Sequence, residues 1–241
     1  MHRSIALILA GGVGSRMSLS IPKQFVVVDG LTVLQHTMLA FQRHQLVGAI
    51  YVVASSQWRD SVCEQAQQAG IDKFVSCLPA GENSFQSARN GILALQDKEH
   101  EKSVILIHDA VRPLISQDII SRNIAVCLSR GNAITALPSH ESYMVVQQKT
   151  SIEGTEKNSS EYISREKLFR AQTPHTFLLS ELSQMMQEAQ DKNITYSQSI
   201  FTLANELGHV PLHIAEGELT NFKLTQPSDF NLFQAILHEI S

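Results

Sequence analysis

The apolar run Ile5–Ala10 leads into a loop that combines glycines with positive charge. The residues of this loop suited to contact a ligand are Gly11, Gly12, Gly14, Arg16 and Lys23. Glycines let the backbone turn sharply and bring its N–H groups close to a ligand, while arginine and lysine supply positive charge at the same place. The combination predicts a site for a polyanion, most simply the triphosphate of a nucleotide.

This loop differs from the two most familiar nucleotide-binding loops. A P-loop would continue with Gly-Lys-Ser/Thr after four spacer residues, and this loop does not. A dinucleotide-binding fingerprint would place a third glycine where Met17 stands. The pattern is therefore typical of neither a standard ATPase loop nor a standard NAD loop.

A longer motif narrows the interpretation. The run Leu9-Ala-Gly-Gly-Val-Gly-Ser-Arg-Met17, followed by Pro22-Lys23-Gln24, resembles the signature of nucleotidyltransferases that make activated sugars and polyols. Within that superfamily the chain resembles the 2-C-methyl-D-erythritol 4-phosphate cytidylyltransferase family, which has the ribitol 5-phosphate cytidylyltransferases as close relatives. The resemblance extends over nearly the whole chain.

The resemblance implies transfer of CMP from CTP to a polyol phosphate, with release of pyrophosphate. It favours methylerythritol 4-phosphate as the acceptor, which would place the enzyme in isoprenoid precursor synthesis. The alternatives are ribitol 5-phosphate or a related polyol phosphate, and a CTP-binding protein that has lost turnover. It also implies Mg²⁺ as cofactor, held mainly by the CTP phosphates because the sequence offers no cluster of carboxylates to form a protein cage.

The nucleophile in such a reaction is a phosphate that is already ionised, so the enzyme needs positive charge more than a strong base. A third cation, Lys223, lies in Asn221-Phe-Lys-Leu-Thr225 near the end of the chain. Taken alone, it could be an ordinary surface lysine. The resemblance implies that Arg16, Lys23 and Lys223 are the catalytic cations.

A second motif, Ile107-His-Asp-Ala-Val-Arg-Pro113, follows a predicted buried strand. Ligands of α/β sheets bind at the carboxyl ends of strands. Asp109 is suited to hold a substrate hydroxyl or a metal-bound water, and Arg112 to pair with a phosphate or to fix the loop. The structural alternatives are a turn cap for Asp109 and an internal ion pair for Arg112.

The remaining site residues rest on the resemblance. It implies nucleotide binding by Ala10, Gly11, Gly12, Gly14, Gly81, Ser87 and Ala110, and substrate binding by Asp109, Arg112 and Arg165. Ser87 could instead be a serine that starts a helix, and Arg165 an ordinary surface arginine. In the related family, the arginine at the position of Arg165 reaches the acceptor phosphate from a neighbouring subunit. Gln172-Thr-Pro-His-Thr-Phe177 resembles an architectural segment, in which we expect Thr173 to cap and Pro174 to fix a turn.

Short apolar runs alternate with helical patterns, which predicts an α/β fold with a mostly parallel sheet flanked by helices, as in Rossmann-like nucleotidyltransferases. The predicted strands are Ile5–Ala10, Ala49–Ala54, Phe74–Cys77, Val104–Ile107, Ala133–Leu137, Val210–Ala215 and Phe222–Leu224. The predicted helices are Val33–Phe41, Gln57–Ala69, Ser84–Leu95, Gln117–Ser129, Ser180–Ala189, Ser199–Leu207 and Ser228–Ile240. We expect a single domain over residues 1–241.

The alternation breaks at residues 139–168, which predicts a protruding hairpin. Glu141–Gln148 and Tyr162–Ser164 read as its strands, and Lys149–Glu161 between them is polar and rich in turn residues. The resemblance implies that this insertion is an arm that embraces a second subunit of a homodimer. A long hairpin buries little against its own domain, which fits such a role.

Composition excludes several functional classes. The net charge is −4 and 17% of residues are charged, so we expect no nucleic-acid or membrane partner. No apolar run is long enough to span a membrane, and the start of the chain does not read as a signal peptide. Cys63, Cys77 and Cys127 show no paired spacing, which favours reduced thiols in a cytoplasmic protein and no metal cluster.

Three departures from the family pattern concern mainly the acceptor side. Ser84 stands where the family usually has an arginine, and His140-Glu141-Ser142 stands in place of an Arg-Asp-Thr trio. Thr195-Tyr-Ser-Gln-Ser199 occupies the region of a Thr-Asp-Glu or Thr-Asp-Ala motif. The sequence therefore defines the nucleotide more firmly than the acceptor.

Overall fold

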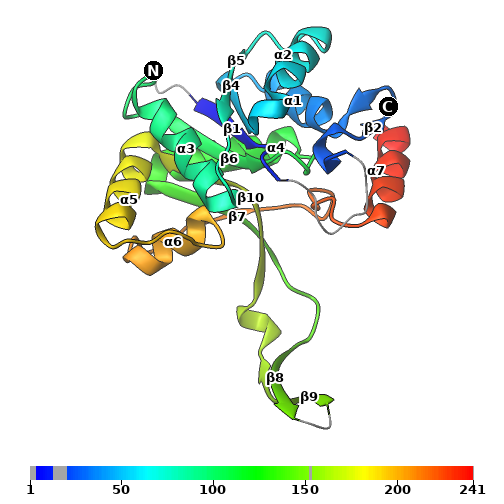
Figure 1. Ribbon diagram of the computed structural model, residues 1–241, viewed down its shortest axis with the longest axis vertical. Coiled ribbons are helices and arrows are strands. Elements are labelled where there is room, and N and C mark those ends of the chain that lie inside the picture. The colour runs from blue at the N-terminus through cyan, green and yellow to red at the C-terminus, as the bar shows by residue number, and fades with distance from the viewer. Residues whose placement is uncertain (1–3, 13–20, 152–153, 241) are drawn as a thin grey trace.

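The computed structural model describes residues 4–12, 21–151 and 154–240, and most of them surround a seven-stranded sheet (Figure 1). The strand order is β11-β7-β10-β6-β1-β4-β5, and β10 is the antiparallel member among these strands. The strands are β1 (Ser4–Leu9), β4 (Val47–Ala54), β5 (Phe74–Pro79), β6 (Val104–Asp109), β7 (Asn132–Pro138), β10 (Phe169–Leu178) and β11 (Ile214–Glu216).

The central strands are apolar along nearly their whole length because both faces of the sheet are covered. Ile5, Leu7 and Ile8 of β1 are fully buried. The order β5-β4-β1-β6 changes direction between β1 and β6, because the chain crosses back over β1 to form β6. Leu9 and Asp109 are register partners at the carboxyl ends of these two strands. This is the switch point at which open α/β sheets bind ligands.

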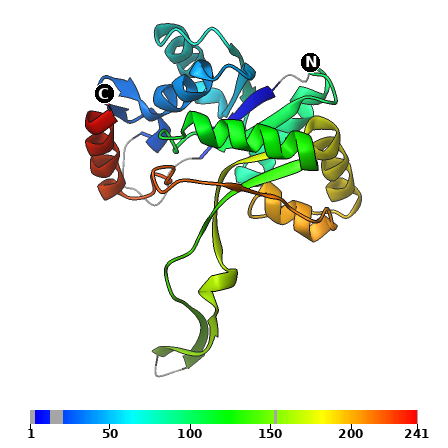
Figure 2. The same ribbon diagram turned by 180° about the vertical axis from the view of Figure 1, so that it is seen from behind.

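Helices cover both faces of the sheet, and Figure 2 shows α4 lying across one of them. One face packs against α1 (Val33–Arg43), α2 (Arg59–Gln68) and α4 (Gln117–Arg130). The other face packs against α3 (Ser84–Gln96), α5 (Leu179–Asp191) and α6 (Ile200–Leu207). A small separate cluster joins α7 (Pro227–Ile240) to the hairpin of β2 (Val27–Val28) and β3 (Leu31–Thr32). Short 3₁₀ helices are η1 (Lys23–Phe25), η2 (Ser56–Trp58) and η3 (Arg165–Lys167).

The predicted α/β fold with a mostly parallel, helix-flanked sheet is confirmed. The structure corrects several predictions in the second half of the chain. Thr173 and Pro174 do not cap or form a turn but lie inside β10, where the pairing with β7 shifts register. The strand predicted at Val210–Ala215 is reduced to β11, and Phe222–Leu224 is an extended segment without strand pairing.

A hairpin of β8 (Tyr143–Ser151) and β9 (Gly154–Ile163) extends away from the layered body (Figure 1). The predicted turn-rich stretch Lys149–Glu161 is therefore largely strand, and the return strand begins well before Tyr162. The side chains of the hairpin that are placed lie exposed, so its strands need no alternation of apolar and polar residues. None of the helices in the described ranges is long and apolar enough to cross a membrane.

Candidate active site

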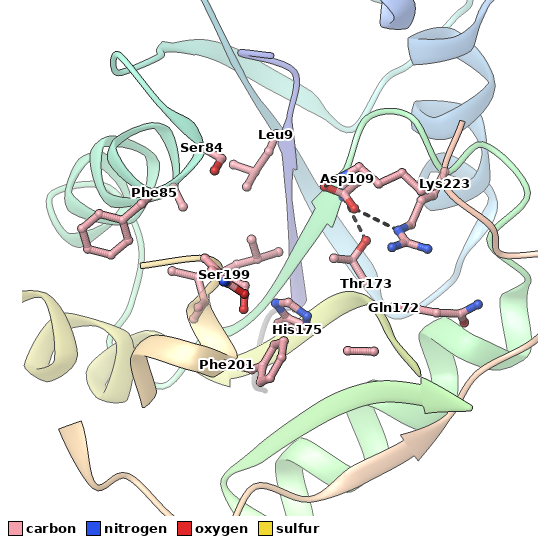
Figure 3. Close-up of a pocket in the computed structure, with 16 residues that line it drawn as sticks. Leu9, Ser84, Phe85, Asp109, Gln172, Thr173, His175, Ser199, Phe201 and Lys223 are labelled. Carbon is pink, nitrogen blue, oxygen red and sulfur yellow. Dashed lines mark hydrogen bonds and ion pairs between the residues drawn. The ribbon is translucent and has the colours of Figure 1, made fainter. Parts of the chain in front are cut away.

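A pocket of about 230 Å³ opens at the switch point between β1 and β6 (Figure 3). Its charged residues are Asp109, Arg112 and Lys223, which come from β6, the loop after it and the segment before α7. The opposite wall is neutral and includes Ser84, Phe85, His175, Ser199, Ile200 and Phe201. Parts of the chain that are distant in sequence thus meet in one cavity.

Asp109 accepts hydrogen bonds from two cations at once. The Nε atom of Arg112 donates to its Oδ2 at 2.9 Å, and the Nζ atom of Lys223 donates to its Oδ1 at 3.0 Å. Burial alone would raise the pKa of Asp109, but the charges and hydrogen bonds of Lys223 and Arg112 outweigh it and hold that pKa far below its usual range. Since two cations face one carboxylate, the three side chains together carry a net positive charge. The cluster is therefore suited to bind an anion.

The segment that carries Lys223 is tied down on both sides. The Nη1 atom of Arg112 donates to the carbonyl oxygen of Asn221 at 2.8 Å, and the backbone N–H of Leu224 donates to the carbonyl oxygen of Val111 at 2.9 Å. The buried amide of Asn221 donates to the carbonyl oxygen of Thr173 at 2.8 Å. The sequence shows Asn221 only as part of a motif, whereas in the structure it anchors this segment.

Lys23, on η1, reaches the same segment from the other side. Its Nζ atom donates to the carbonyl oxygens of Leu224 at 3.4 Å and Thr225 at 3.5 Å. The two predicted catalytic lysines therefore approach one short stretch of backbone, although one lies near each end of the chain. Arg16 and Gly14 lie outside the described residues.

The described part of the first loop is held by Gln24, for which the sequence motif alone indicates no role. Its Nε2 atom donates to the carbonyl oxygens of Ala10 at 2.6 Å and Gly12 at 3.0 Å. Gln24 is buried, so these two hydrogen bonds tie η1 firmly to the backbone of Ala10 and Gly12. The backbone of Gly12 is exposed beside it.

The first loop packs closely against the turn between β5 and α3. A Cβ atom on Gly11 would lie 2.9 Å from the Oγ atom of Ser87 and 2.9 Å from the Cβ atom of Ala80. The backbone N–H of Gly81 donates to the Oγ atom of Ser87 at 3.0 Å, and a Cβ atom on Gly81 would lie 2.8 Å from the carbonyl carbon of Gln86. Both glycines are therefore required by close approach of backbone to backbone or side chain.

These contacts also show that Ser87 is not the serine that starts α3, whereas its role in nucleotide binding stays a prediction. The cap of α3 is Asn83, whose side chain accepts the backbone N–H of Gln86 at 2.9 Å. Ser87 lies further along the helix and is buried against Gly11 and Gly81. The structure thus brings together four predicted nucleotide-binding residues, which are Ala10, Gly11, Gly81 and Ser87.

Ala110 connects the end of β1, which leads into the glycine loop, to the loop after β6, which carries Arg112. Its backbone N–H donates to the carbonyl oxygen of Leu9 at 3.0 Å, and its own carbonyl oxygen accepts the hydroxyl of Thr37 at 2.8 Å. Ala110 is buried. Its contacts fix the loop after β6 to the end of β1.

Arg165 is not brought to this pocket within one chain. It lies on η3, which follows β9 on the protruding segment, and its side chain is exposed. The expectation that it serves a second subunit needs a partner chain and stays a prediction.

The sequence does not reveal a chain of hydrogen bonds behind Asp109, which runs through His108 and Thr173 and is called the relay below. Burial lowers the pKa of His108 to about 4, and the hydrogen bond to the Arg112 carbonyl only partly offsets it, so the ring is neutral at pH 7. A neutral ring donates from Nε2 to the carbonyl oxygen of Arg112 at 3.1 Å and accepts the Thr173 hydroxyl at Nδ1, also at 3.1 Å. The Thr173 oxygen in turn accepts the backbone N–H of Asp109 at 3.0 Å.

This relay fixes the loop that carries Asp109 and Arg112, and it depends on Thr173 lying in β10 next to β6. The histidine stood in a motif that the sequence analysis had singled out. The threonine could be found only by knowing that β10 pairs with β6.

The chain is similar to known proteins over nearly its whole length. The sequence profile of the family described as "IspD: 2-C-methyl-D-erythritol 4-phosphate cytidylyltransferase" matches residues 4–239. A ribitol-5-phosphate cytidylyltransferase of Lacticaseibacillus paracasei is 35% identical over 97% of this chain and 97% of its own length. A 2-C-methyl-D-erythritol 4-phosphate cytidylyltransferase of Geobacter metallireducens is 33% identical over 97% of each chain.

Solved structures show the same architecture. A 4-diphosphocytidyl-2C-methyl-D-erythritol synthase superposes with a TM-score of 0.76 at 27% identity, covering 98% of this chain and 99% of its own. The 2-C-methyl-D-erythritol 4-phosphate cytidylyltransferase of Thermus thermophilus gives a TM-score of 0.73 at 25% identity, covering 99% of this chain and 100% of its own. With its fold, its glycine loop and its sequence in agreement, the chain belongs to the 2-C-methyl-D-erythritol 4-phosphate cytidylyltransferase family, whose members are nucleotidyltransferases.

Proposed function

We propose that this protein transfers CMP from CTP to a polyol phosphate and releases pyrophosphate. The observation that carries the proposal is the meeting of Lys23 and Lys223 on one backbone segment beside the Asp109–Arg112 pair. A glycine loop and the Gly81 turn lie at the same edge of the sheet. This arrangement places fixed positive charge next to backbone groups that are suited to hold a nucleotide.

In the proposed reaction, a phosphate oxygen of the acceptor attacks the α-phosphorus of CTP. A new P–O bond forms to the acceptor, the bond to the oxygen that bridges the α- and β-phosphates breaks, and pyrophosphate leaves with that electron pair. The attacking oxygen is already ionised, so no side chain has to remove a proton. Lys23 and Lys223 would neutralise the charge that builds up on the phosphates, and Asp109 would hold Lys223 in place.

We propose that Mg²⁺ binds mainly through the CTP phosphates. In the described part of the chain no group of three or more His, Cys, Asp or Glu residues is placed to hold a metal ion. Both carboxylate oxygens of Asp109 already accept hydrogen bonds from cations. A site built in this way fits a metal ion that arrives with its own phosphate ligands, where it would add charge neutralisation.

For the acceptor, we rank ribitol 5-phosphate ahead of methylerythritol 4-phosphate, which reverses the order favoured by the motifs. Relatives at 35% and 33% identity are named ribitol-5-phosphate cytidylyltransferases, and relatives named for methylerythritol phosphate are 33% and 31% identical. The neutral pocket wall also contains Ser84, one of the departures from the family pattern.

Pyrophosphate release from CTP and Mg²⁺ tests this proposal, with ribitol 5-phosphate and methylerythritol 4-phosphate assayed in parallel. We expect turnover with ribitol 5-phosphate at a kcat/KM at least tenfold higher than with methylerythritol 4-phosphate. A higher kcat/KM with methylerythritol 4-phosphate would reverse the ranking of the acceptors but would still support the proposed CMP transfer. No turnover with either acceptor, together with measurable CTP binding by calorimetry, would contradict an active enzyme for these polyol phosphates.

A further inference from the structure

Asp229, in the first turn of α7, gathers three hydrogen bonds on one carboxylate oxygen. Its Oδ2 atom accepts the backbone N–H of Thr225 at 2.6 Å, the Thr225 hydroxyl at 3.0 Å and the backbone N–H of Gln226 at 2.7 Å. The backbone N–H of Asp229 donates back to the carbonyl oxygen of Gln226 at 3.1 Å. The carboxylate therefore fixes the turn that joins the Lys223 segment to α7.

The same two peptide groups also face Lys23. The carbonyl oxygen of Leu224 and the N–H of Thr225 belong to one peptide group, and the carbonyl oxygen of Thr225 and the N–H of Gln226 belong to the next. Lys23 donates to both carbonyl oxygens, at 3.4 and 3.5 Å, while Asp229 accepts from both N–H groups. Each peptide dipole thus points its negative end at the ammonium and its positive end at the carboxylate.

We propose that Asp229 is a positioning residue that holds the Lys23 ammonium against these two peptide groups, next to Lys223. The inference rests on the proposed cytidylyltransferase function. Lys223 lies only two residues before Thr225, and the Leu224 N–H between them is held by the Val111 carbonyl oxygen at 2.9 Å. The Lys223 side is thus held without Asp229, by this hydrogen bond and by the ion pair with Asp109. The carbonyl oxygens to which Lys23 donates, in contrast, depend on the turn that Asp229 fixes.

The charge on Asp229 matters in addition to its shape. An asparagine keeps an acceptor oxygen and nearly the same volume but lacks the negative charge that polarises both peptide groups. The pKa of Asp229 agrees with this: burial would raise it, but hydrogen bonds from Thr225 and Gln226 and the charge of Lys23 lower it. Asp229 is thus ionised whenever the enzyme works near neutral pH.

The test compares CTP affinity, measured by titration calorimetry, in wild type, Asp229→Asn, Lys23→Met and the double variant. We expect Asp229→Asn alone to raise the Kd of CTP about tenfold, the size of effect typical of a lost charge-assisted interaction. In the Lys23→Met background we expect the same change to alter the Kd less than twofold, because the residue acts through Lys23. If Asp229 only stabilised the fold, Asp229→Asn would raise the Kd of CTP equally with and without Lys23.

Glu239→Gln is the matched control, because it removes the same charge from an exposed position near the other end of α7. It should leave the Kd of CTP unchanged, and thermal unfolding checks that each variant is folded. Thr225→Val is the alternative variant if Asp229→Asn does not fold, because it removes one of the three donors to the carboxylate. It should raise the Kd of CTP about threefold when Lys23 is present and leave it unchanged in the Lys23→Met background.

Three results would overturn the inference. They are a Kd of Asp229→Asn within twofold of wild type, a loss that is equally large in the Lys23→Met background, and a similar loss in Glu239→Gln. Absence of CTP binding by the wild-type protein would instead overturn the proposed function itself and, with it, this inference.

Discussion

Asp109 is the residue through which the charges of the pocket are arranged. It pairs with Arg112 and Lys223 at once, and its backbone is held by Thr173. Removing either cation would leave the carboxylate with one partner, whereas removing the carboxylate would release both cations. The lysine is the more exposed of the two, so it is the cation best placed to exchange its carboxylate for a substrate phosphate.

Lys223→Ala should therefore lower turnover strongly without unfolding the protein. We expect kcat for pyrophosphate release to fall by about 10²–10³, the range seen when one transition-state donor is removed. Lys98→Ala, at an exposed lysine after α3, is the control and should keep the wild-type rate. A Lys223→Ala enzyme with near-normal kcat would remove Lys223 from the catalytic cations.

His175 gives the pocket a pH-dependent contribution to stability. Burial is the main cause that lowers its pKa from 6.5 to about 4. Between these values the unfolded chain binds a proton that the folded ring does not, so the free energy of unfolding falls as pH falls from 6.5 towards 4. The size of this loss is about 3 kcal/mol for one such histidine.

His175→Gln removes that proton-binding group and should flatten part of the pH dependence. Between pH 7 and pH 4.5, we expect urea unfolding to show a loss of stability about 2–3 kcal/mol smaller than in wild type. His108, which shifts in the same direction, supplies the part that remains. His140→Gln, at an exposed position, should behave like wild type, and identical pH profiles for all three proteins would contradict the prediction.

Among the elements, β10 does most to build the pocket. It lies between β6 and β7 and contributes Gln172, Thr173 and His175 to the lining. The Gln172 amide donates to the Glu218 carbonyl oxygen at 2.8 Å, which ties β10 to the segment that leads to Lys223. One strand thus supports both the Asp109 loop and the Lys223 segment.

The turn between β5 and α3 is the second element on which the site depends. The variant Gly81→Ala tests whether this turn contributes to CTP binding. The new Cβ atom would overlap Gln86 at the start of α3, so the turn must shift and disturb its hydrogen bond to Ser87, the residue that packs against Gly11. We expect the Kd of CTP to rise about tenfold, because close backbone approach is lost. Glu82→Ala, at the exposed neighbouring residue, is the control, and equal affinities of the two variants would contradict a role for this turn.

The elements also show why some predictions from sequence succeeded and others did not. Buried parallel strands such as β1 and β4 consist of continuous apolar runs, and the loops at their ends carry the glycines and charges that mark the site. In contrast, β10 contains a proline, which normally argues against a central strand. The register shift before His175 accommodates Pro174, and this compensation is visible only when the neighbouring strands are in place.

The errors near the end of the chain have a similar cause. Phe222–Leu224 is extended and partly apolar, but Leu224 is buried under α7 and hydrogen-bonded to a loop instead of a strand. The anchoring roles of Gln24, Thr173 and Asn221 likewise depend on partners far away in sequence. Local patterns therefore predict which residues reach the site more reliably than which residues hold them there.

For the whole molecule, the main question is what covers the extended hairpin. It exposes large apolar side chains, including Met144 at 71%, Val146 at 55% and Tyr162 at 83%. Exposed apolar groups on an arm favour contact with another protein. We propose that the contact is a second copy of this chain and that Arg165 then reaches the partner's acceptor site.

The wild-type protein should therefore sediment as a dimer at micromolar concentration, and the double variant Met144→Glu/Tyr162→Glu should sediment as a monomer. In this monomer we expect the KM of the acceptor to rise about tenfold more than the KM of CTP, because Arg165 is no longer supplied. Leu128→Glu, at a residue that is 49% exposed on α4, is the control and should stay dimeric. A monomeric wild-type protein would contradict the proposal.

Pro138 and Phe169, the last residue of β7 and the first of β10, are register partners in the sheet. Just beyond them, the Ser139 N–H donates to the Leu168 carbonyl oxygen at 2.8 Å. The chain therefore departs and returns at the same place, and everything between these residues is topologically a single loop of a β-hairpin. Such an insertion can be shortened or lengthened without altering the sheet, so the subunit contact and the acceptor binding that we propose for the arm could both change while the nucleotide side of the site stays the same.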